Sequence, residues 1–155
     1  MQIYIMRHGQ AEMMANSDSE RALTQIGRSE SERMASSLAD QEVVFDAVMV
    51  SPYLRAQQTW ESVRPFFPET ANVQIVKSLT PSGSARKSVN EILALQAMGI
   101  KSLLIVSHLP LVGYIVGELA PAAGVPAFAT SAVGYLELDE SGFGVLHSLT
   151  RVSQL

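Results

Sequence analysis

The sequence contains no cysteine, and this absence excludes several structures and chemistries at once. Without thiols there is no disulfide framework, no cysteine-ligated metal site and no cysteine nucleophile. The chain also lacks an apolar run of the roughly 18 residues that a membrane-spanning helix requires. Its first residues, 1–7, have neither the basic region nor the long apolar stretch of a secretion signal. The sequence therefore predicts a cytoplasmic protein.

Clustered positive charge is missing as well. The chain carries 11 Lys and Arg against 15 Asp and Glu, which gives a net charge of −4. Nucleic acids and anionic membranes are bound by basic patches, so neither is an expected partner. The length of 155 residues and the 47% hydrophobic content are typical of one globular unit. We expect a single domain over residues 1–155.

Short apolar segments alternate with helical patterns along most of the chain. The pattern predicts strands over 2–6, 47–50, 73–76 and 103–106, and helices over 26–40, 53–65, 84–98 and 110–119. Such alternation produces right-handed crossovers and a mainly parallel sheet. Two further strands, 133–138 and 145–149, flank a sequence typical of a hairpin turn. The predicted fold is an α/β three-layer sandwich: a mainly parallel central sheet flanked by helices, with an antiparallel hairpin at the C-terminal end.

A polar segment follows each of the four predicted parallel strands. These segments are Arg7-His8-Gly9, Ser51-Pro52-Tyr53-Leu54-Arg55, Leu79-Thr80-Pro81 and Ser107-His108-Leu109-Pro110. Open parallel sheets bind ligands at the carboxyl ends of their strands. We therefore expect the four segments to meet at one edge of the sheet, where they would bring two arginines and two histidines together.

These side chains suit the transfer of a phosphoryl group. The planar, charged fork of an arginine bonds two phosphate oxygens at once, which fits Arg7 and Arg55. His8 is the predicted nucleophile, because surrounding positive charge lowers the pKa of an imidazole and keeps the ring neutral. His108 would bind an equatorial oxygen in the transition state. Gly9 would permit close backbone approach, with nearby N–H groups as further donors.

The same residue types also have less specific interpretations. A single histidine or arginine at a strand end is usually an ordinary hydrogen-bonded or solvated residue. Two of the three histidines, however, directly follow predicted parallel strands, and only His147 is predicted to be structural. A zinc site on His8 and His108 is disfavoured, because the flanking arginines repel a cation and no third ligand is evident. The sequence predicts neither a metal nor another cofactor.

The spacing of these residues resembles the histidine phosphatase superfamily (phosphoglycerate-mutase-like). The motifs that carry this resemblance are Arg7-His8-Gly9, Ser51-Pro-x-x-Arg55-Ala56-x-x-Thr59 and Ser107-His108-x-Pro110. A closer similarity to the small SixA-type phosphohistidine phosphatases adds Leu23-Thr24-x-x-Gly27, Leu79-Thr80-Pro81, Leu111-Val-Gly-Tyr114 and Thr130-Ser131. The resemblance implies an α/β sandwich in which His8 accepts the phosphate while Arg7, Arg55 and His108 form the pocket. Arg21 is a further candidate at the rim of that pocket.

A general acid is missing from the place where larger relatives commonly carry one, after the third strand. Residues 77–90 contain no Asp or Glu. Glu12 and Asp18 remain as candidates in the first loop, and both are interpreted as solvated carboxylates. Expelling an alkoxide normally needs such an acid, whereas the labile P–N bond of phosphohistidine needs it less once the imidazole is protonated. The short chain also leaves no room for a capping insertion, so the pocket would be open to another protein.

The leading hypothesis is therefore a metal-independent protein phosphohistidine phosphatase that acts through a phospho-His8 intermediate. Its expected partner, by resemblance, is a phosphorylated histidine phosphotransfer domain or phosphocarrier protein. Two alternatives stay open: a small-molecule phosphomonoesterase or mutase, and a non-catalytic module that binds phosphoproteins in the same pocket.

Overall fold

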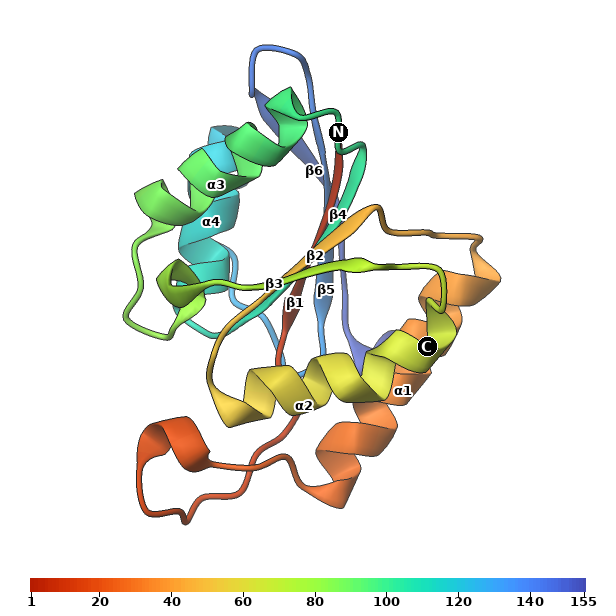
Figure 1. Cartoon of the computed structure of the whole chain (residues 1–155), viewed down its shortest axis with the longest axis vertical. Coiled ribbons are helices and arrows are strands. Elements are labelled where there is room, and N and C mark those ends of the chain that lie inside the picture. The colour runs from red at the N-terminus through yellow and green to blue at the C-terminus, as the bar shows by residue number, and fades with distance from the viewer.

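A six-stranded sheet forms the centre of the protein in a computed structural model that describes all 155 residues (Figure 1). Its strands are β1 (Gln2–Arg7), β2 (Ala47–Val50), β3 (Asn72–Ile75), β4 (Ser102–Ser107), β5 (Val133–Leu138) and β6 (Gly144–Thr150). Their order across the sheet is β3-β2-β4-β1-β5-β6. Strands β1 to β4 run parallel, whereas β5 is antiparallel to β1 and β6 is antiparallel to β5. The predicted sheet and its antiparallel C-terminal hairpin are confirmed.

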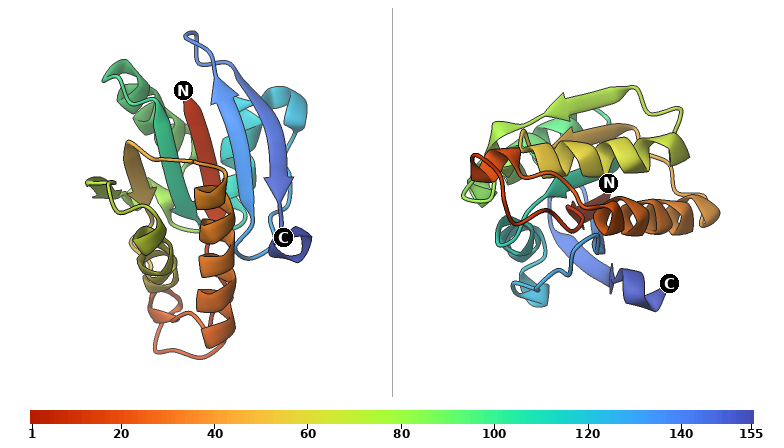
Figure 2. Two further views of the ribbon diagram at one scale, coloured as in Figure 1. Left: turned by 90° about the vertical axis from the view of Figure 1, so that its right-hand side faces the viewer. Right: turned by 90° about the horizontal axis from the view of Figure 1, so that it is seen from below.

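Helices cover both faces of this sheet, as Figures 1 and 2 show. The four helices are α1 (Gln25–Asp40), α2 (Leu54–Val63), α3 (Ala85–Ala97) and α4 (Leu111–Leu119). One core contains residues of α1 and α2, and the second contains residues of α3 and α4. The three-layer sandwich predicted from the sequence is therefore confirmed. None of these helices has the length and apolar character needed to cross a membrane.

Alternate residues of the central strands point into opposite cores. In β1, Ile3 and Ile5 pack in the core with α3 and α4, whereas Tyr4 and Met6 pack in the core with α1 and α2. Strands β2 and β4 are buried along their whole lengths. Side chains on a strand alternate between its two faces, so a strand covered on both faces requires a continuous apolar run. This double burial explains the unbroken apolar segments in the sequence.

Element boundaries differ from the predicted ones by one or two residues, for identifiable reasons. Helix α1 begins at Gln25 because Thr24 caps it by accepting the Gly27 N–H at 3.0 Å. The helix predicted over 53–65 ends at Val63, and a 3₁₀ turn that contains Pro65 follows it. The third strand spans 72–75 instead of 73–76. Three of its four residues are exposed, because β3 lies at the sheet edge.

Candidate active site

Strand register places two histidine rings side by side at the carboxyl edge of the sheet. Strands β1 and β4 pair in parallel with Arg7 opposite Ser107, so the next residues, His8 and His108, leave the sheet at the same level. Their ring centroids lie 5.0 Å apart. Helix α2, which follows β2, brings Arg55 to the same place, with its Nε atom 3.4 Å from His8 Nε2. The structure thus brings these predicted site residues together.

The His8 ring turns its unprotonated nitrogen toward Arg55, whose Nε–H donates to it at 3.4 Å. Its Nδ1 atom lies 2.7 Å from the carbonyl oxygen of Gly9. A carbonyl only accepts hydrogen bonds, so Nδ1 carries the proton and Nε2 keeps its lone pair. Burial lowers the pKa of His8 to about 4; the Gly9 hydrogen bond opposes this shift, and the charges of Arg55 and Arg7 add to it. Positive charge was the only cause predicted from the sequence, whereas burial contributes more.

A short hydrogen-bond chain holds the ring of the second histidine. The backbone N–H of Tyr53 donates to Ser51 Oγ at 3.2 Å, and Ser51 Oγ lies 2.7 Å from His108 Nε2. The serine hydroxyl can donate its own proton to Nε2, and in that tautomer the ring proton is on Nδ1. That Nδ1 atom is buried and has no protein partner. Burial lowers the pKa of His108 to about 2, and the positive charges of His8, once protonated, and of Arg55 add to this shift, so the ring is neutral.

Arg7 supplies another unpaired donor beside these rings. Its Nη1 atom donates to the carbonyl oxygen of Phe128 at 2.9 Å, whereas its Nε atom is buried without a partner. Burial and the charge of Arg55 lower the pKa of Arg7. A buried donor without a partner costs about 1–3 kcal/mol. An oxyanion bound here would relieve that cost at Arg7 Nε and at His108 Nδ1.

Gly9 connects the loop after β1 to the neighbouring helices. Its N–H donates to Thr59 Oγ1 at 3.0 Å, and the Thr59 hydroxyl donates to the Arg55 carbonyl at 2.8 Å. A Cβ atom at position 9 would lie only 2.7 Å from the carbonyl oxygen of Gly27 in α1. The close approach expected of Gly9 is therefore an approach to α1, and its N–H is occupied by Thr59 instead of being free for a ligand.

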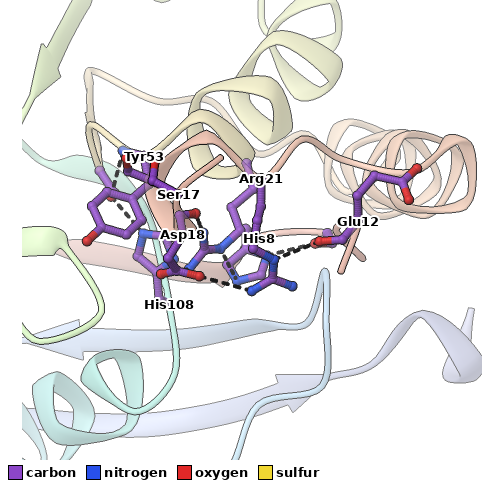
Figure 3. A network of polar contacts seen from close by, with 11 residues as sticks. His8, Glu12, Ser17, Asp18, Arg21, Tyr53 and His108 are labelled. Carbon is purple, nitrogen blue, oxygen red and sulfur yellow. Dashed lines mark hydrogen bonds and ion pairs between the residues drawn. The ribbon is translucent and has the colours of Figure 1, made fainter. Parts of the chain in front are cut away.

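The first loop contributes a carboxylate that the sequence did not place in the site (Figure 3). Asp18 Oδ2 lies 3.1 Å from Arg55 Nη2, and the Asp18 carbonyl oxygen accepts from Arg55 Nη1 at 2.6 Å. Arg21 Nη1 donates to Asp18 Oδ1 at 3.2 Å, and Arg21 Nε donates to the Glu12 carbonyl. Asp18 was interpreted from the sequence as a solvated loop carboxylate; its side chain is 56% exposed, but two arginines also hold it. The spacing of three residues between Asp18 and Arg21 was the available signal.

Other residues at the site act through a ring face or through the backbone. The guanidinium of Arg55 lies 5.1 Å from the Tyr53 ring centre, and this ring lies edge-on to His108. Ser131, with a φ of 60°, donates its N–H to the carbonyl oxygens of Arg7 and His8. Both residues stand within segments named in the sequence analysis, Tyr53 at a strand end and Ser131 in the Thr130-Ser131 pair, but neither was assigned a role in the site.

The third strand-end segment and the third histidine do not contribute side chains to the cluster of His8, Arg55 and His108. In the third strand-end segment, the Leu79 carbonyl accepts from the hydroxyl of Ser107, the residue before His108, at 2.7 Å. His147 lies on β6, with Nε2 3.7 Å from Glu137, and takes no part in the cluster. No group of three or more His, Asp or Glu side chains is arranged to hold a metal ion.

Comparison with known proteins identifies the class to which this site belongs. Residues 3–80 match the family model of the histidine phosphatase superfamily (branch 1), and the chain belongs to that family. It is 45% identical over 147 residues to the phosphohistidine phosphatase SixA of Escherichia coli (strain K12), covering 95% of this chain and 91% of that protein. The SixA homolog of Haemophilus influenzae is 40% identical, covering 90% and 89%. A solved structure of the protein histidine phosphatase SixA complexed with tungstate superposes with a TM-score of 0.97, at 43% identity and 99% coverage of each chain.

Proposed function

We propose that this protein is a metal-independent phosphohistidine phosphatase in which His8 is the nucleophile. The observation that carries the proposal is the state of the His8 ring: neutral and unprotonated at Nε2, which accepts only a long hydrogen bond of 3.4 Å from Arg55 Nε. The names of the two SixA relatives, at 45% and 40% identity, support the same activity. Tungstate in the similar solved structure is a tetrahedral oxyanion like phosphate, which supports an oxyanion pocket here.

The reaction we propose proceeds in two transfers. His8 Nε2 attacks phosphorus with its lone pair, and the P–N bond of the substrate breaks, so that its electron pair returns to the departing imidazole. Water then attacks the phosphorus of phospho-His8, and the N–P bond breaks with its electron pair returning to His8 Nε2. One proton of the water passes to the phosphate, which leaves as inorganic phosphate. Three donors surround the oxygens during both transfers: the Arg55 guanidinium, Arg7 Nε and His108 Nδ1. Fixed donors of this kind stabilise the charge on the equatorial oxygens without reorganising.

The remaining site residues have supporting parts in this proposal. Arg21 stands at the rim, where it holds Asp18, and Gly9 closes the loop against α1 so that His8 keeps its orientation. The substrate we propose is a histidine phosphotransfer domain or phosphocarrier protein that presents its phosphohistidine to the pocket. We propose that residues 1–155 act as one domain and that the reaction takes place in the cytoplasm, a reducing compartment compatible with a chain without cysteine.

The test is to incubate the protein with a histidine-phosphorylated phosphotransfer domain and, separately, with phosphosugars. The wild type should remove phosphate from the phosphoprotein and acquire acid-labile phosphate on His8. The variant His8→Asn, which keeps a neutral polar side chain, should do neither. His147→Asn removes a histidine outside the site and serves as the matched control. Equal phosphate loss with the wild type and His8→Asn contradicts the proposal, and comparable turnover of phosphosugars indicates a phosphomonoesterase instead.

A further inference from the structure

A negative charge stands at the mouth of a pocket built to bind an anion. The Asp18 carboxylate contacts Arg55 Nη2 at 3.1 Å and Arg21 Nη1 at 3.2 Å. Its side chain remains 56% exposed, and it borders an open hollow of about 300 Å³ lined by Met13, Ala15, Ser17 and Arg21. A ligand that contacts the Arg55 guanidinium in front of His8 therefore lies close to this carboxylate, because Arg55 contacts both His8 Nε2 and Asp18.

The two edges of the Arg55 guanidinium face different groups. Its Nη1 and Nη2 atoms point to the carbonyl and carboxylate oxygens of Asp18, whereas its Nε atom points to His8 Nε2. A phosphate held in front of His8 therefore shares this guanidinium with Asp18. Burial raises the pKa of the Asp18 carboxyl, but hydrogen bonds from Arg21 and Arg55 outweigh this effect and lower it, which keeps the carboxylate ionised. Every bound phosphate dianion is thus repelled by a neighbouring like charge.

This repulsion acts differently on different phosphate compounds. A phosphate ester carries its negative charge next to a neutral alkyl or aryl group, so nothing offsets the carboxylate. A phosphorylated imidazole that is protonated on its second ring nitrogen carries a positive charge directly beside the phosphoryl group. That N–H can also donate to a carboxylate oxygen, and a charge-assisted hydrogen bond of this kind is stronger than a neutral one.

We propose that Asp18 is a specificity-determining residue that selects phosphorylated imidazole over phosphate esters by pairing with the protonated ring. The inference rests on the proposed function and deepens it. In the transfer step, His8 Nε2 forms the new N–P bond as the old P–N bond breaks. The electron pair neutralises the departing ring, which leaves as imidazole with its proton still on the second nitrogen. Asp18 remains a carboxylate throughout and holds the ring in its reactive, protonated form.

The experiment compares the wild type with Asp18→Asn, which keeps the shape of the side chain and removes its charge. Two small substrates, phosphoimidazole and p-nitrophenyl phosphate, separate the leaving-group chemistry from docking of a protein partner. Inhibition by inorganic phosphate measures the repulsion directly. Glu12→Gln is the matched control, because it removes one negative charge from the same loop, and only the backbone carbonyl of Glu12 contacts Arg21. The Glu12 carboxylate points away from the Asp18 network (Figure 3).

For Asp18→Asn we expect weaker selectivity for phosphoimidazole but stronger binding of inorganic phosphate. The kcat/KM for phosphoimidazole should fall relative to that for p-nitrophenyl phosphate by about tenfold, while inorganic phosphate should inhibit at a concentration roughly three- to tenfold lower. Glu12→Gln should match the wild type in both measurements. A residue that merely held Arg55 in place would weaken phosphate inhibition and slow both substrates together.

An unchanged selectivity ratio overturns the proposal, and so does phosphate inhibition that is unchanged or weaker in Asp18→Asn. These outcomes differ from failure of the proposed function, in which the wild type itself would not dephosphorylate phosphoimidazole or a phosphohistidine protein.

Discussion

The neutral, buried state of His8 makes the stability of this protein depend on pH. Burial, partly opposed by the Gly9 hydrogen bond and reinforced by the arginine charges, lowers the pKa of His8 from 6.5 to about 4. Below about pH 6.5 the unfolded chain takes up a proton on this ring, whereas the folded protein does not until about pH 4. Proton uptake therefore favours unfolding as the pH falls through this window. Below the window both states are protonated, and His8 causes no further loss.

The size of the effect follows from the two pKa values. The difference between 6.5 and about 4 is about 2.5 units, and at roughly 1.4 kcal/mol a unit it corresponds to about 3 kcal/mol of unfolding free energy. His8→Asn places a neutral amide in the pocket at every pH and so removes this contribution. The stability of the wild type relative to His8→Asn should therefore fall by about 3 kcal/mol between about pH 7 and about pH 4.

Urea unfolding can measure this difference through the fluorescence of Trp60, the only tryptophan, which is buried in the core. The buffers must contain no phosphate or sulfate, because either anion would bind the folded pocket and stabilise it. His147→Asn removes a histidine whose side chain is 45% exposed, and its stability curve should run parallel to that of the wild type. Parallel curves for the wild type and His8→Asn across the window would refute the buried, neutral state of the ring.

Two further predictions concern side chains that support the site. Ser51→Ala removes the donor to His108 Nε2, so turnover of a phosphohistidine substrate should fall about tenfold. NMR of the ring nitrogens should show a mixture of tautomers in this variant, and an unchanged tautomer would argue against the role of Ser51. Thr59→Val leaves the N–H of Gly9 buried without its partner, and urea unfolding should show a loss of about 1–3 kcal/mol. Thr59→Ser keeps the hydroxyl and should lose much less; equal losses in the two variants would exclude the hydrogen bond as the cause.

Much of the fold was predictable because its signals are local. The apolar runs of β1, β2 and β4 indicated strands covered on both faces, and the helical spacing between them required crossovers and a parallel sheet. The edge position of β3 was not predictable, because strand order depends on which elements pair across the sheet. The start of α1 at Gln25 and the end of α2 at Val63 depend on a cap and a turn that shift boundaries by only a residue or two.

The sequence by itself determined which residues stand at the carboxyl ends of the parallel strands, and it therefore predicted that His8, Arg55 and His108 would meet at one edge of the sheet. Only the tertiary structure decided the protonation and the ion pairing of the residues in the site. The low pKa of His8 arises mainly from burial, and the segments that bury this ring are distant from one another in the chain. The contact between Asp18 and Arg55 likewise joins residues 37 positions apart, through a loop without a regular pattern. Residue types and strand ends are encoded locally, whereas protonation and charge pairing depend on distances that exist only after the chain has folded.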